Sequence, residues 1–153
     1  MTPEARLTEL KLVLPPPPKP MATYATAVRH GDLLYVSGHG PLRADGSYLT
    51  GKLGADLGVA EGREAARLTA LAVLATVRGC VGSLDRIARI IKVLGLVNST
   101  PDFVEQPQVI NGFSDLMVQV FGDAALAVRS AVGTVSLPAG IAVEVEAVFQ
   151  LAG

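Results

Sequence analysis

Two glutamates near the carboxyl end have the residue type and spacing needed for acid–base chemistry. Glu144 and Glu146 alternate with apolar residues, so a strand here projects both carboxyl groups from one face, roughly 7 Å apart. On a solvated edge strand such a pair needs no function. If an interface buries this face, an unpaired carboxylate is costly unless it binds something. The pair therefore has two readings, an exposed acidic edge or a binding site.

An arginine precedes the strand expected just before this one. Arg129 shares its parity with Ala131 and Gly133, whose small side chains leave space beside it. A guanidinium is always charged and presents a planar fork that matches a carboxylate. The pattern predicts a pocket for a small carboxylate, and the alternative is a surface arginine paired with an acid.

Other chemistries lack the residues they need. The run Ser37–Gly40 begins like a phosphate-binding glycine loop, but Arg43 occupies the position of the third glycine. His30, His39 and Cys80 lack the spacing of zinc ligands, so no metal site is expected.

Composition limits the class of protein. The chain has 153 residues, which fits one domain. Half of the residues are apolar and only 18% are charged, so we expect part of the surface to be covered in an oligomer. A net charge of -1 excludes the basic field that nucleic-acid binding needs. No membrane helix or secretion signal is expected, and a cytoplasmic location is the default.

The elements that must position these residues follow from periodicity and turn residues. We expect, in order, a helix over 3–13, an extended proline arm over 14–20, strands over 23–28 and 33–37, a loop over 41–58, a helix over 59–77 ended by glycines 79 and 82, a strand over 87–97, a helix over 106–121, and strands over 130–137 and 141–151. Both strand pairs are expected to be hairpins. This order predicts an α+β fold with two helices on one face of a sheet, the strand over 87–97 being central and covered on both faces. The sheet's other face then needs a partner.

Three motifs resemble one known family. Arg129-Ser130-Ala131-Val132, Leu137-Pro138 and Val143-Glu144-Val145-Glu146-Ala147 closely resemble the carboxy-terminal signature of the Rid (YjgF-like, reactive intermediate deaminase) family, and Tyr35-Val36-Ser37-Gly38 resembles its first hairpin. The resemblance divides the chain into a helix and proline-rich arm over 1–20 and a Rid-like domain over 21–153. It implies a chorismate-mutase-like β-β-α-β-α-β-β subunit, assembled as a homotrimer with a ligand cleft at each subunit interface.

The resemblance also implies roles for particular residues. Arg129 would grip a substrate carboxylate and Glu146 would activate water, while the pocket would be completed by Tyr24, Ser37, Gly38, His39, Asn111 and Ala131. The implied reaction hydrolyses enamines or imines such as 2-aminoacrylate to a keto acid and ammonia, with no metal or cofactor. Ala131 replaces the usual cysteine of the deaminase branch, and His39 its frequent glutamine. A non-catalytic sensor of small carboxylates is therefore the second hypothesis, and an endoribonuclease is the third.

Overall fold

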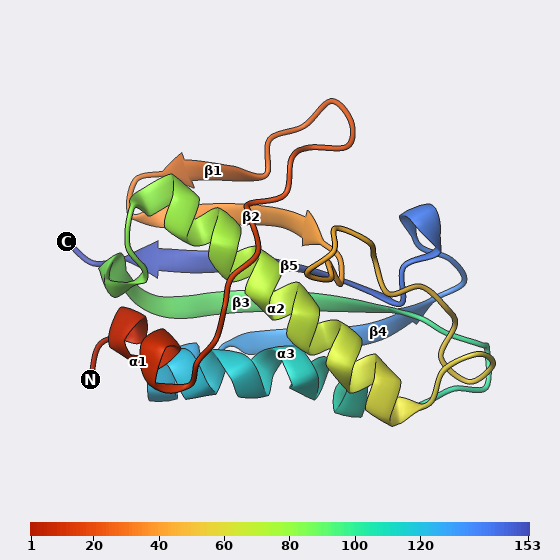
Figure 1. The fold of residues 1–153 in the computed structure, drawn as a ribbon. Coiled ribbons are helices and arrows are strands. Elements are labelled where there is room, and N and C mark those ends of the chain that lie inside the picture. The colour runs from red at the N-terminus through yellow and green to blue at the C-terminus, as the bar shows by residue number, and fades with distance from the viewer.

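Alternating apolar strands and two amphipathic helices build the expected α+β architecture. The computed structural model describes residues 1–153 and has one five-stranded mixed sheet in the order β1-β2-β5-β3-β4, with α2 and α3 on one face (Figure 1). The strands are β1 (Ala27–His30), β2 (Leu33–His39), β3 (Ile87–Asn98), β4 (Val128–Thr134) and β5 (Val143–Leu151). The α-helices are α1 (Pro3–Glu9), α2 (Val59–Val81) and α3 (Gln106–Phe121), and short 3₁₀ turns lie at Leu84–Arg86, Gly122–Ala125 and Pro138–Gly140. The predicted fold class is confirmed.

The two long helices cover the core face of the sheet. Helix α3 has the predicted bounds, and Gly122 ends it with φ 65° while its N–H donates to Val118. Helix α2 runs four residues beyond the predicted end, so the expectation that Gly79 ends it was wrong. The N–H of Gly82 caps it on Arg78, because hydrogen bonding and the buried Val81 continue past Gly79. Neither helix is long and apolar enough to cross a membrane.

The order of the strands corrects two expectations. Strand β4 pairs in parallel with β3, and β5 lies between β2 and β3, antiparallel to both. The predicted second hairpin does not form. The segment after β4 crosses the end of β3, and β5 then pairs with β3 on the side opposite to β4. The interior place suits β5 because apolar residues occupy every core-facing position of this strand, and all of them are buried there. The two glutamates of β5 therefore do not lie on an edge strand.

One face of the sheet has no helix over it. Strand β3 is interior as expected, but in the single chain it is covered on one face only, since Ile91 and Lys92 are exposed. Four further large apolar side chains are exposed on the other strands: Val28, Tyr35, Val128 and Val132. We call this surface the open face. Apolar patches of this kind mark interfaces, which agrees with the predicted need for a partner.

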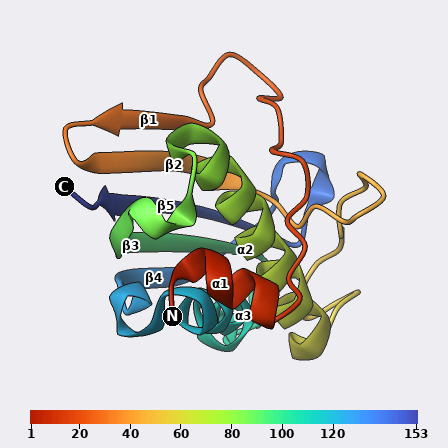
Figure 2. The ribbon, with the colours of Figure 1, turned by 60° about the vertical axis from the view of Figure 1, so that its left-hand side comes forward.

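The amino-terminal segment is fastened to the helices. Thr2 caps α1, its hydroxyl accepting from the Ala5 N–H at 3.3 Å, and Leu7 is part of the core. Helix α1 stops short of the predicted residue 13, because Lys11 has a left-handed φ of 54°. Figure 2 shows α1 against α3 and the extended arm running over α2. A methyl group on Gly79 would lie 3.5 Å from Pro17, so this stretch of α2 is close to the arm.

Helices α2 and α3 touch through backbone at one point. A Cβ atom on Gly112 would collide with the carbonyl oxygen of Arg63, so only glycine allows this approach. The Arg63 guanidinium holds the crossing from outside, donating to Asp115 at 2.8 Å and to the Gln108 carbonyl at 3.1 Å. The distance between the two helices therefore depends on one missing side chain.

We predict that Gly112→Ala destabilises the protein by about 1–3 kcal/mol or more, because the helices must separate. The matched control is Gly79→Ala, where the nearest atom leaves ordinary van der Waals space. Because alanine has the higher helix propensity, Gly79→Ala should raise the free energy of unfolding by up to about 1 kcal/mol. Urea denaturation followed by circular dichroism measures both, and equal changes in the two variants would contradict the role of the crossing.

Candidate functional site

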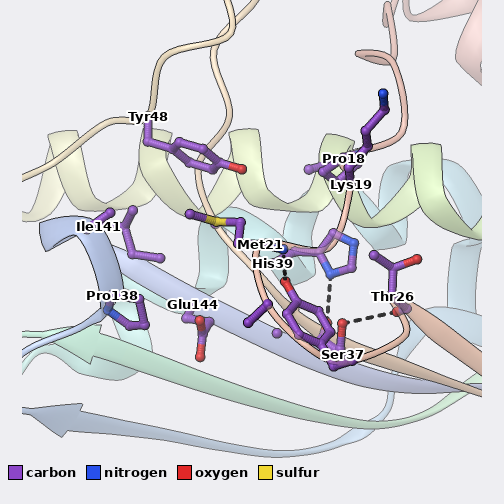
Figure 3. A pocket seen from close by; sticks show the side chains of 16 residues that line it. Pro18, Lys19, Met21, Thr26, Ser37, His39, Tyr48, Pro138, Ile141 and Glu144 are labelled. Atoms are coloured by element: carbon purple, nitrogen blue, oxygen red, sulfur yellow. Dashed lines mark hydrogen bonds between the residues drawn. The ribbon is translucent and has the colours of Figure 1, made fainter.

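A cavity of about 410 Å³ lies between the arm, the end of β2, α2 and the start of β5 (Figure 3). It brings together four residues that the sequence predicted for the pocket, Tyr24, Ser37, Gly38 and His39. We call it the arm cavity. Its position follows from the segment just before β1, where the Thr26 carbonyl accepts from the Ser37 N–H at 2.9 Å and from the Ser37 hydroxyl at 3.1 Å, which ties this segment to β2.

A β-bulge turns His39 away from the open face. Val36 pairs with Ala147 and His39 with Val145, so β2 uses one more residue than β5 over this stretch. The extra residue reverses the side-chain alternation and points the imidazole toward α2. His39 is 4% exposed as a result.

The imidazole of His39 is neutral and both ring nitrogens are bonded. Nδ1 lies 2.6 Å from the Ser37 carbonyl oxygen, which only accepts, so Nδ1 carries the proton. Nε2 then accepts from the Thr76 hydroxyl at 2.8 Å. Burial lowers the pKa of His39 below 6.5, partly offset by the bond to Ser37. His39 therefore positions the end of β2 and has no free nitrogen to act as a base.

Glu144 is the carboxyl group that borders the arm cavity. Burial, together with the nearby charge of Glu146, raises the pKa of Glu144 above 4.5. A Cβ atom on Gly38 would lie 2.8 Å from the Glu144 Cδ, so the glycine lets this carboxyl lie directly against the backbone of β2. A half-buried acid with a raised pKa keeps its proton to higher pH than an exposed glutamate, which suits it to act as a general acid.

Glu146, the acid predicted to be catalytic, occupies another place. It is exposed on the open face and borders a separate hollow with Tyr35 and Lys92. Its partners across the sheet are residues of β3, with Leu94 opposite. The structure thus brings Glu144 to four of the predicted pocket residues, whereas Glu146 shares its hollow with only one of them, Ser37.

Arg129 lies at the other edge of the sheet. Its Nη1 donates to Asn111 at 2.9 Å and to Ser114 at 3.1 Å, and its Nη2 donates to the Pro107 carbonyl at 3.3 Å. No carboxylate lies within ion-pair distance of it. The arginine is therefore not one half of a surface ion pair, and α3 holds its guanidinium in a fixed orientation.

The predicted pocket residues fall into two groups within one chain. Ala131 lies with Arg129 on the helix side of β4, as their shared parity predicted, and Asn111 of α3 bonds to the guanidinium there. Strands β3 and β5 separate this group from β2 and the arm cavity. A single subunit therefore does not bring Arg129 to the carboxyl group of Glu144.

Some residues that line the arm cavity or bond to its lining were missed in the sequence. Thr76, which bonds His39, lies on the apolar side of α2, where the sequence pattern does not distinguish it from a core residue. Tyr48 lies in the segment expected to be a loop, and Ile141 lies at the expected start of a strand. Alternation alone placed both glutamates on one face and had no means to choose between them. No group of three His, Cys, Asp or Glu side chains is close enough to hold a metal ion.

Three comparisons agree on the family. A family profile described as "YjgF/chorismate mutase-like, putative endoribonuclease" matches residues 4–145. Protein TCP17 of Trypanosoma cruzi is 44% identical over 148 residues, which are 96% of this chain and 92% of that protein. The crystal structure of Atu1372 from Agrobacterium tumefaciens, a protein of unknown function, is 42% identical with a TM-score of 0.90, covering 97% of this chain and 92% of that one.

A crystal structure from Shewanella oneidensis, described like the family profile as a "putative endoribonuclease", is similar over the full length. It is 32% identical with a TM-score of 0.94 and covers 99% of this chain and 100% of its own. These similarities include α1 and the arm as well as the sheet. The chain therefore belongs to the YjgF/chorismate-mutase-like family, which is the Rid family that its carboxy-terminal motifs resemble.

Proposed function

We propose that this protein is a deaminase that hydrolyses reactive enamines and imines of the 2-aminoacrylate type to a keto acid and ammonia, at clefts between the subunits of a cytoplasmic homotrimer. One observation carries the proposal. An oriented guanidinium without an acid partner lies at one edge of the sheet, and a cavity with a proton-donating carboxyl group lies toward the other. These are complementary halves of a site for a small carboxylate.

The guanidinium would hold the substrate. Three of the N–H groups of Arg129 are bonded to α3, and the others have no protein acceptor. A fixed guanidinium with free donors binds a carboxylate without first reorganising. The partly buried Asn111 and Ser114 thus act as positioning residues for Arg129.

The carboxyl group of Glu144 would move protons. In its protonated form it donates to the terminal carbon of the enamine, which becomes an iminium ion. Water adds to the iminium carbon while the Glu144 carboxylate takes the proton that water loses. The carbinolamine transfers its hydroxyl proton to nitrogen and expels ammonia, leaving the keto acid. We propose Glu144 in place of Glu146 because burial and the neighbouring charge raise its pKa.

The open face would join the two halves. Its exposed apolar side chains need a cover, and a second chain placed there brings a new arginine edge to an arm cavity. A homotrimer satisfies this three times with identical contacts.

A non-catalytic carboxylate sensor at the same cleft is the second candidate. Ala131 in place of the usual cysteine favours it, since the group beside Arg129 has no thiol. The description of relatives as endoribonucleases receives less support from the site. One of the two histidines, His39, is buried with both nitrogens bonded, and the net charge of -1 gives no general attraction for RNA.

We predict that Arg129→Ala lowers kcat/KM for freshly generated 2-aminoacrylate at least about 100-fold, because a charge-assisted bidentate contact is lost. The matched control is Arg67→Ala, an arginine of α2 paired only with the exposed Glu64. Ammonia and keto-acid release are measured. Equal rates for Arg129→Ala and the unmodified protein would dismiss the proposed role. Arg129-dependent keto-acid binding without turnover in the unmodified protein would favour the sensor.

We predict opposite outcomes for the two glutamates. Glu144→Gln should abolish turnover, because the amide cannot donate the carboxyl proton. Glu146→Gln should stay active and shift the alkaline limb of the pH–rate profile to lower pH, because removing its charge lowers the pKa of Glu144. Loss of activity in Glu146→Gln alone would restore the original assignment of Glu146.

We predict a native mass three times the 15.8 kDa of the chain. Val132→Lys, on the open face, should reduce it to the monomer mass by placing an unpaired charge in the contact. The control is Val104→Lys, an exposed position outside the sheet. Native mass spectrometry gives the result, and a monomeric unmodified protein would remove the basis for an intersubunit site.

A further inference from the structure

The arm cavity has two chemically different ends. Figure 3 shows Thr26, Ser37 and His39 at one end and Tyr48, Pro138 and Ile141 at the other. The hydroxyl groups and the bonded imidazole make the first end polar. Two aliphatic side chains and a tyrosine ring make the second end predominantly apolar, with the carboxyl group of Glu144 at its border beside Pro138.

The apolar end is built by a close approach of its own residues. A Cβ atom on Gly40 would lie 3.0 Å from Ile141 and 3.2 Å from the ring of Tyr48, so glycine is what lets these two side chains reach the end of β2. Ala72 of α2 also lines the cavity and is 1% exposed. Any larger residue at this position would occupy the cavity from the helix side.

The size of the cavity exceeds the need of the smallest substrate. At about 410 Å³ it falls among pockets that take whole organic ligands, which span about 300–1,000 Å³. 2-Aminoacrylate carries only a methylene group beyond its amino and carboxyl groups. It would leave water against the apolar walls, and an apolar substituent that displaced this water would bind more tightly.

We propose that the arm cavity is a side-chain pocket that selects 2-imino acids with branched or aromatic apolar side chains, and that Met21, Tyr24 and Ala72 determine this specificity. The inference rests on the proposed function because it places the carboxylate at the same cleft. It deepens that function by naming the substrate class. The pocket holds the substituent while the intersubunit site holds the carboxyl and imine groups.

The segment that joins the arm to β1 supplies one wall of this pocket. The Met21 N–H donates to the Tyr24 hydroxyl at 3.2 Å, which closes a short turn over the cavity. Both side chains line the cavity, yet Tyr24 is 42% and Met21 is 69% exposed. A substituent that entered would bury part of this exposed surface, so binding and wall closure favour each other.

The test uses stable keto acids, which are the products of the corresponding imines. Calorimetry compares pyruvate, 4-methyl-2-oxopentanoate and phenylpyruvate on the full-length protein. Both bulky acids should bind at least about tenfold more tightly than pyruvate, because each adds several buried apolar carbons.

Two variants locate the effect. Ala72→Leu should fill the pocket and reduce the preference for the bulky acids at least about fivefold, while pyruvate binding changes by less than about twofold. Met21→Ala, at an exposed position that cannot disturb the core, should weaken the bulky acids alone by about threefold or more. Ala60→Leu, an exposed alanine of α2 outside the cavity, should change nothing.

The outcomes separate this inference from the proposed function. Equal affinity for the three acids, tighter binding of pyruvate, or no binding of any of them overturns the side-chain pocket even if 2-aminoacrylate is turned over. A graded affinity that Ala72→Leu and Met21→Ala both leave intact also overturns it. A graded affinity that the variants reduce supports the pocket, even in a protein without deaminase activity.

Discussion

The sheet is covered by helices on one face only, and the other features of this molecule depend on that asymmetry. Helices α2 and α3 bury one set of alternating side chains, and the crossing at Gly112 holds the two helices together. The opposite set includes exposed apolar residues and both glutamates of β5. The apolar side chains of this surface are costly to expose to water, and its carboxylates are costly to bury without a partner. The proposed second chain and ligand would satisfy both needs.

Much of the fold could be predicted from local pattern. The bounds of α3 followed from its apolar spacing and from Gly122, and the first hairpin followed from the turn at Gly31. The place of β5 could not be predicted in this way, because strand order depends on which strand has the most to bury, and a proline-glycine turn looks the same before a hairpin and before a crossover. The end of α2 was misjudged because a glycine inside a helix costs only about 1 kcal/mol.

The sequence predicted the positions of the candidate site residues only in part. The parity of Arg129 with Ala131 correctly placed them on one side of β4, where Asn111 and Ser114 meet the guanidinium. The choice between Glu144 and Glu146 depends on depth, and depth depends on the backbone of Gly38 lying close to one acid and not to the other. The bulge that buries His39 leaves no mark in the sequence, since an extra residue in a strand has no compositional signature.

The fastening of the arm has a consequence for how the family could diversify. Glu4 accepts from the Leu84 N–H at 2.9 Å and pairs with Arg78, and the far end of the arm continues into β1. A segment anchored at both ends tolerates changes in its middle without loosening the rest. Residues 15–24 can thus be rewritten in length or bulk while the acid, the guanidinium and the sheet stay as they are. One scaffold can thereby present different walls to the arm cavity through a stretch that lies outside its helices and strands.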